Sequence, residues 1–292
     1  MTTLTTPAPA RARRHGGMRP RTPAEWVLLI LAILGALAAF IPFLLILLNA
    51  FKSPQDYANG GPLNLPTAVY TDGLQAFWER VNFPEKVWNS ILISTLVAVF
   101  AVIVSVLNAF AIGIGRVKGR TSIVLLFLLA NMLPQEALLY PLYYMFKEVG
   151  LYNTVWAVII IFIVIQTAFG TYLLSSLYGT FPREMLEAAA LDGATRWRTL
   201  RSVVVPISRP TIGVLLVFFF IWTWNEFLIP ITFLISNKSQ TVPIAIASLQ
   251  GDRLMDVTTT SGAALLGLIP TVIFFLVFQR TLTRGVTAGA VK

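Results

Sequence analysis

The sequence contains no cysteine, and its single histidine, His15, lies in a polar stretch near the N-terminus. The absence of cysteine excludes disulfides, thiolate metal sites and a thiol nucleophile. One histidine outside the apolar segments excludes a histidine-based metal or catalytic cluster. No Gly-x-x-x-x-Gly-Lys-Ser/Thr stretch is present, so the chain has no phosphate-binding loop of its own. We therefore expect neither a metal nor another cofactor.

Charged residues are also scarce. They make up 12% of the 292 residues, whereas 56% are hydrophobic. A soluble domain usually carries about 25% charged residues, because its surface has to meet water. A surface with so little charge is suited to lipid. The composition therefore predicts an integral membrane protein.

Six segments are long and apolar enough to cross a bilayer, which takes about 20 residues. They cover residues 26–51, 87–115, 121–146, 149–179, 210–237 and 257–279. Glu136 interrupts the third segment and Glu226 the fifth. We predict an all-α membrane protein with six transmembrane helices.

The basic residues are distributed unevenly between the two sides. If the spans alternate, one side carries Arg11, Arg13, Arg14, Arg19, Arg21, Arg116, Lys118, Arg120, Arg183, Arg196, Arg198, Arg201, Arg209, Arg280, Arg284 and Lys292. The other side carries Lys52, Arg80, Lys86, Lys147, Lys238 and Arg253. Cytoplasmic loops are the ones enriched in Lys and Arg. We expect a multi-pass protein of the cell membrane with both termini in the cytoplasm, and the net charge of +9 follows from this topology rather than from nucleic-acid binding.

The composition also suggests how the chain is organised. Residues 1–23 are expected to form a disordered basic tail, and residues 24–86 the first helix and an outer loop. Residues 87–280 hold the other five helices, and residues 281–292 form a C-terminal tail. Within the core, residues 182–206 form a long polar segment on the basic side.

This polar segment predicts two short helices at the cytoplasmic surface. Pro182 suits a helix start, and strong helix formers follow from Glu187. Gly193 allows a turn, and a second helix from about Ala194 is expected to stop at Pro206. The small alanines allow a partner's backbone to come close, and an arginine on a partner can grip Glu187. The segment is either a docking element or an amphipathic helix that touches only lipid.

The segment resembles the EAA loop of ABC-importer permeases. The match rests on Glu187, Ala188, Ala189 and Gly193, and on the apolar-x-apolar-Pro pattern that ends at Pro206. The resemblance implies the type I importer permease fold, in which this loop is a cytoplasmic coupling helix seated in a cleft of an ATPase subunit. It also implies an ATPase dimer, a second related permease and an extracytoplasmic solute-binding protein as partners. The implied coupling residues are Glu187, Ala188, Ala189, Asp192, Gly193 and Pro206.

Two further segments resemble the maltose-type, MalG-like carbohydrate branch of these permeases. One is the run Trp224, Asn225, Glu226 and Phe227, and the other is the C-terminal sequence from Arg284 to the end. In that branch the tail reaches into the ATPase dimer, and the outer loop before the last helix contacts the binding protein. The resemblance assigns Thr287, Gly289 and Val291 to the tail contact, and Gln250 and Gly251 to the binding-protein contact.

Polar residues within the spans are candidates for the solute path. Ionised carboxylates in hydrocarbon are costly, so Glu136 and Glu226 are expected to face the protein interior or water. The candidate path residues are Asn131, Gln135, Glu136, Tyr140, Trp224, Asn225 and Glu226. The alternative is that these groups anchor helix packing or lie at an interface.

The function indicated is that of a permease subunit, which is not itself an enzyme. It would form half of an alternating-access path for a di- or oligosaccharide, driven by separate ATPase subunits. A glycerol-phosphate-like solute is an alternative. A secondary transporter in which Glu136 and Glu226 carry protons is another, but it leaves residues 182–206 and the tail unexplained.

Overall fold

The structure is a computed structural model that describes residues 22–115, 117–251 and 256–290, with side chains for 22–115, 117–249 and 256–280. Every regular element within these ranges is a helix. The chain divides into a unit of residues 1–45 and a larger unit of residues 46–292. Most of α1 (Pro23–Ala50) belongs to the first unit, and its sequence is apolar from Trp26 to Leu48.

The larger unit contains the remaining helices. They are α2 (Pro54–Gly60), α3 (Asp72–Arg80), α4 (Phe83–Gly113), α5 (Arg120–Asn131), α6 (Gln135–Glu148), α7 (Val155–Gly179), α8 (Arg183–Leu191), α9 (Arg196–Thr199), the π-helix η1 (Leu200–Val204), α10 (Val205–Asn225), α11 (Leu228–Phe233), the 3₁₀ turn η2 (Asn237–Ser239), α12 (Val242–Ala247), the 3₁₀ turn η3 (Ser248–Gly251) and α13 (Val257–Ala290). Short helices therefore occupy the two predicted outer loops.

The number of spans agrees with the sequence when one bent pair is counted as a span. Five helical stretches in the described residues are long and apolar enough to cross a membrane. The pair α5 and α6 passes the same test only when its two helices are taken together, and these are bent by 92°. The prediction of one continuous helix over residues 121–146 is wrong. Pro134, in an extended conformation with ψ 132°, separates the two helices because it disfavours a helical conformation at Leu133 and has no N–H to donate.

The fifth predicted span also ends earlier than expected. α10 stops at Asn225, and Glu226 adopts an extended conformation with ψ 135° before α11 begins. An unbroken helix would need a hydrogen bond from residue 230 to the carbonyl of residue 226, but Pro230 has no N–H. The chain therefore breaks within residues 210–237, close to Glu226.

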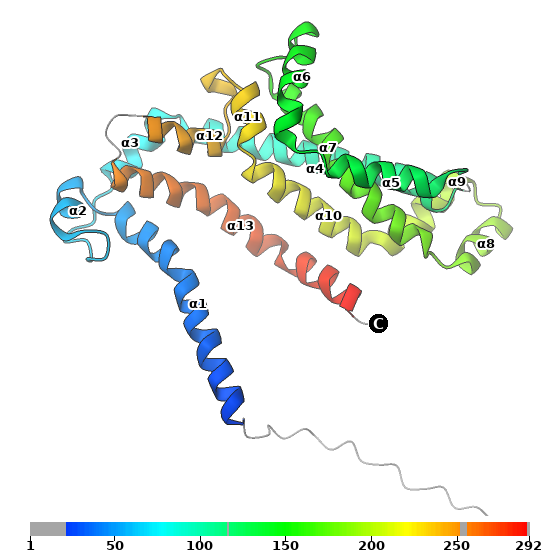
Figure 1. Cartoon of the computed structure of the whole chain (residues 1–292), viewed down its shortest axis with the longest axis horizontal. Helices are drawn as coiled ribbons and strands as arrows, with labels where there is room; N and C mark the ends of the chain where they lie inside the picture. The colour runs from blue at the N-terminus through cyan, green and yellow to red at the C-terminus, as the bar shows by residue number, and fades with distance from the viewer. Residues whose placement is uncertain (1–21, 116, 252–255, 291–292) are drawn as a thin grey trace, which may run out of the picture. The chain divides into compact units, whose positions relative to one another are not determined.

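The centre of the larger unit is the packing of α4 against α7 and α10, which run side by side (Figure 1). The contact between α4 and α7 is close because small residues meet there. A Cβ atom on Gly170 of α7 would lie 2.3 Å from the Ser105 hydroxyl of α4. Apolar clusters fill the interface at both ends, one around Val97, Phe162 and Phe233 and the other around Ala109, Leu174 and Phe219.

Candidate functional site

The polar segment after α7 folds as helix, turn and helix, as predicted. Pro182 precedes α8 at its N-cap position. The helix ends in two characteristic hydrogen bonds, from the Ala194 N–H to the Ala189 carbonyl at 2.9 Å and from the Gly193 N–H to the Ala190 carbonyl at 3.0 Å. This is a Schellman motif, which needs a left-handed residue where Gly193 has φ +69°. The turn between the two helices is therefore fixed by Gly193.

The second helix does not stop at Pro206, so that part of the prediction is wrong. Thr195 caps α9 by accepting the N–H of Arg198 at 3.3 Å. α9 then passes through η1 into α10, and residues 196–225 form one helical stretch. In η1 the Val205 N–H bonds to the carbonyl of Leu200, five residues back. Pro206 follows this π-turn within the continuous stretch, and the helix continues past it although Pro206 has no N–H to donate.

The far end of this helix–turn–helix is exposed although it carries apolar residues. Leu191, at the end of α8, is 89% exposed, and Trp197 of α9 is 64% exposed. Glu187, Ala188, Asp192 and Gly193 are exposed as well. Ala189 is the one buried residue of α8, all of which the structure describes. Four of the six predicted coupling residues are thus uncovered within the described chain, whereas Ala189 is buried and Pro206 is half-buried.

A groove runs between α8 and η1 on this exposed surface. It has a volume of about 490 Å³, and its walls include Ala188, Ala189, Asp192, Ala194 and Val203. Small side chains make up much of the wall, so a partner's side chain can approach the backbone of α8 closely. A groove with an exposed apolar residue, Leu191, beside it is typical of a surface that binds a protein, whereas single exposed apolar residues need no partner.

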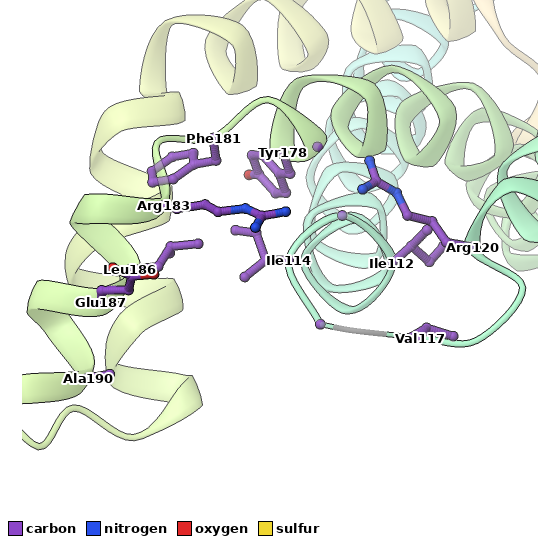
Figure 2. Close-up of a pocket in the computed structure, with 13 residues that line it drawn as sticks. Ile112, Ile114, Val117, Arg120, Tyr178, Phe181, Arg183, Leu186, Glu187 and Ala190 are labelled. Carbon is purple, nitrogen blue, oxygen red and sulfur yellow. The ribbon is translucent and has the colours of Figure 1, made fainter.

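A second cavity, of about 510 Å³, lies behind α8, where α4 and α7 end and α5 begins. Figure 2 shows the Arg183 side chain reaching from α8 toward Ile114 and Tyr178, with Glu187 on the α8 wall. Arg120 lines the cavity from α5 and donates from Nη2 to the carbonyl of Ser175, at 3.3 Å. α8 thus faces the last turn of α4 across this cavity.

The break between α10 and α11 gives Glu226 a structural task. Its carboxylate accepts the backbone N–H groups of Phe227 and Leu228, both at 3.2 Å, and so caps α11. Trp224 is buried and stacks on Phe220 at 5.9 Å between ring centroids. Asn225 is exposed and donates to the carbonyl of Ile221 at 2.7 Å. These contacts favour the anchoring alternative for Glu226 and Trp224.

The bend between α5 and α6 holds the other predicted path residues. Asn131 donates to the carbonyl of Phe127 at 2.8 Å and closes the end of α5. Gln135 is half-buried, whereas Glu136 and Tyr140 are exposed. The Tyr140 hydroxyl contacts that of Tyr144 at 3.1 Å. No hydrogen bond or ion pair among the described residues joins this bend to Glu226.

The remaining predicted residues lie at the edges of the described chain. Gln250 and Gly251 close the turn η3, and their side chains are outside the described part. Thr287 and Gly289 belong to α13, whose helical backbone continues to Ala290, and Val291 lies outside the described residues. Residues 1–21 of the predicted basic tail lie outside them as well.

One group of polar residues was missed by the sequence analysis. Lys86, Asn89 and Ser90, in the first two turns of α4, are buried and bond to residues 237–242. Their spacing of i, i+3 and i+4 places them on one helix face, which was a usable signal for an inward-facing polar stripe.

Comparison with known sequences identifies the class of protein. The family described as binding-protein-dependent transport system inner membrane component matches residues 108–287. This chain belongs to that family. The match begins in the last two turns of α4 and ends in α13, and therefore includes both cavities beside α8. It leaves out α1, α2, α3 and most of α4.

Members of this family with curated names resemble the chain over nearly its whole length. The trehalose/maltose transport system permease protein MalG of Thermococcus litoralis is 30% identical over 281 residues, which is 94% of this chain and 99% of that protein. The trehalose transport system permease protein SugB of Mycobacterium tuberculosis is 30% identical over 277 residues, covering 94% and 100%. The melibiose/raffinose/stachyose import permease protein MelC of Bacillus subtilis is 27% identical and covers 93% and 98%.

The fold is shared with a solved transporter. A chain in the crystal structure of a bacterial ABC transporter involved in the import of the acidic polysaccharide alginate superposes with a TM-score of 0.77 at 19% identity. The match covers 90% of this chain and 99% of that one. The fold predicted from the sequence, that of a type I importer permease, is thereby confirmed.

Proposed function

We propose that this family member is one of two permease subunits of an ATP-driven importer for a di- or oligosaccharide. The observation that carries the proposal is the exposed helix–turn–helix of α8 and α9, held by the Gly193 turn and presenting Leu191 and Trp197. Relatives named for trehalose, maltose, melibiose, raffinose and stachyose transport support a sugar as the solute.

The proposed partners are inferred from the phosphate-binding loop that the chain lacks and from the α8 and α9 surface that it exposes. Its sequence has no phosphate-binding loop, so ATP hydrolysis belongs to separate subunits that dock on α8 and α9. The excess of basic residues supports a cytoplasmic location for this end and for both termini. A second permease completes the path, and an extracytoplasmic binding protein delivers the sugar at the opposite end, near η3.

The proposed mechanism is alternating access. Closure of the ATPase dimer on ATP moves the two coupling helices together. Because α9, η1 and α10 form one helical stretch, movement of α9 is passed directly to a transmembrane helix. The membrane helices then open outward and accept the sugar from the binding protein. Hydrolysis returns the complex to the inward-facing state.

The test is sugar uptake by vesicles that contain the complete complex. Vesicles assembled from this chain, its partner permease, the ATPase and the binding protein should accumulate a labelled disaccharide only with internal ATP and external binding protein. Glycerol phosphate serves as the comparison solute. Uptake that does not depend on ATP but is abolished by an uncoupler would show a secondary transporter instead.

A further inference from the structure

A polar stripe on the first turns of α4 is fully enclosed by protein. Lys86 is 0% exposed, and Asn89 and Ser90 are buried beside it. We name these three residues the outer clamp. Lys and Asn are seldom buried at the end of a membrane helix without a specific partner.

The partners of the outer clamp are mainly backbone atoms of residues 237–242. The Lys86 ammonium donates to the carbonyl and the side-chain oxygen of Asn237. Asn89 Nδ2 donates to the carbonyls of Lys238 at 2.6 Å and of Gln240 at 3.0 Å. Ser90 Oγ accepts the N–H of Val242 at 2.9 Å. One face of α4 therefore bonds to four of the six residues from 237 to 242, mainly through their backbone.

The buried charge of Lys86 makes it costly to separate residues 237–242 from α4. Lys86 Nζ forms an ion pair with Glu85 at 3.8 Å, a distance too long for a hydrogen bond. The oxygens of Asn237 accept its hydrogen bonds. Losing partners of a buried charge is costly, so the segment cannot separate from α4 cheaply.

The clamped segment leads toward η3, where the proposed function puts the contact with the binding protein. Residue 242 begins α12, whose Val242 and Ala245 pack with Phe77, Trp224 and Ala263. η3, with Gln250 and Gly251, follows α12 without a break. A push on η3 is therefore passed through α12 and the clamp to the start of α4.

The other end of α4 faces α8 across a cavity, and Leu186 of α8 packs against the apolar cluster that contains Ala109 of α4. α4 has 31 residues and is about 46 Å long. Its last residues, Ile112 and Gly113, line the cavity of Figure 2 together with Leu186 and Glu187 of α8. A Cβ on Gly113 would lie 2.6 Å from the Tyr178 Cβ, so α4 and α7 are in close contact there.

We propose that α4 transmits binding-protein docking from the outer clamp to the coupling helix, with Lys86, Asn89 and Ser90 as positioning residues. This inference rests on the proposed function. Coupling between two sites is reciprocal, so the nucleotide state of the ATPase must in turn change the affinity for the binding protein through the same helix.

The test compares clamp variants in the complete complex in lipid nanodiscs. In Lys86→Met we expect the binding protein to stimulate ATP hydrolysis at least about fivefold less than in the unaltered complex, the lower end of ordinary allosteric coupling. The basal hydrolysis rate should stay the same. The change in binding-protein affinity between the nucleotide-free and the vanadate-trapped complex should shrink by a similar factor. Ser90→Ala, a smaller change, should act in the same direction.

The control is Lys147→Met, since Lys147 is an exposed lysine of α6 outside the clamp. It should leave stimulation unchanged. Clamp variants with normal stimulation, or with basal and stimulated rates that fall together, would overturn the inference. Failure of both clamp variants to assemble would also overturn it, by making the clamp a folding element. A binding protein that never stimulates the unaltered complex would instead contradict the proposed function.

Discussion

The turn at Gly193 offers the sharpest test of how the helix–turn–helix of α8 and α9 is built. Gly193 has φ +69°, and a Cβ atom added there would meet nothing within 4 Å. Substitution with alanine therefore adds no clash and costs only the left-handed conformation, about 1–2 kcal/mol. If the segment can adopt other conformations before the ATPase binds, a cost of that size lowers the equilibrium constant for forming the native turn about 5- to 30-fold.

The assay is the affinity of the purified ATPase subunit for the permease pair in nanodiscs. Gly193→Ala should weaken it by up to about 30-fold, since each 1.4 kcal/mol lost corresponds to about tenfold. Gly193→Asn should recover much of the affinity, because Asn tolerates the left-handed region. Gly119 provides a matched control, with φ +74° and equally open surroundings at the start of α5. If Gly119→Ala weakens binding as much as Gly193→Ala, or neither does, the turn has no particular role in docking.

Four further predictions follow from the same structure. Glu187→Lys should abolish co-purification of the ATPase by reversing the charge on the α8 surface beside Arg183, and undiminished recovery would contradict this. Deleting residues 287–292 should lower substrate-stimulated hydrolysis in the assembled complex, and an unchanged rate would exclude a role for the tail. Gly170→Ala should destabilise the α4–α7 contact by about 1–3 kcal/mol in thermal unfolding, since its Cβ would lie 2.3 Å from the Ser105 hydroxyl, whereas Gly35→Ala, with open space, should not. Burial raises the pKa of Asp256, but hydrogen bonds from Thr259 and Thr258 outweigh it and hold that pKa below its usual value. The stabilisation of the folded state by the ionised carboxylate is present above about pH 4 and is lost as the pH falls through the lowered pKa. The difference in melting temperature between the unaltered protein and Asp256→Asn should therefore narrow on acidification.

Much of the fold was predictable because lipid imposes simple rules on sequence. Uncharged segments of about 20 residues marked α1, α4, α7 and most of α10 and α13. The turn at Gly193 was predictable because only a few residue types adopt a left-handed conformation easily. Each of these inferences uses local information only.

The errors arose where tertiary structure decides what a proline does. Pro134 ends a helix, whereas Pro206 lies within a continuous helical stretch because a π-turn precedes it. Hydropathy alone does not distinguish these two cases. The outer clamp was missed for a related reason, since Lys86 and its partner Asn237 lie 151 residues apart in sequence.

Accessibility of a single engineered cysteine tests the central proposal most directly. The chain has no cysteine, so Leu191→Cys introduces a unique thiol into it at the end of α8, where the Leu191 side chain is 89% exposed. In nanodiscs a water-soluble maleimide should label this thiol in the isolated permease pair, and the assembled ATPase should block labelling and form cross-links to it. Labelling only by lipid-soluble reagents, with no cross-link to any ATPase, would show that α8 lies in the bilayer and not against a motor subunit.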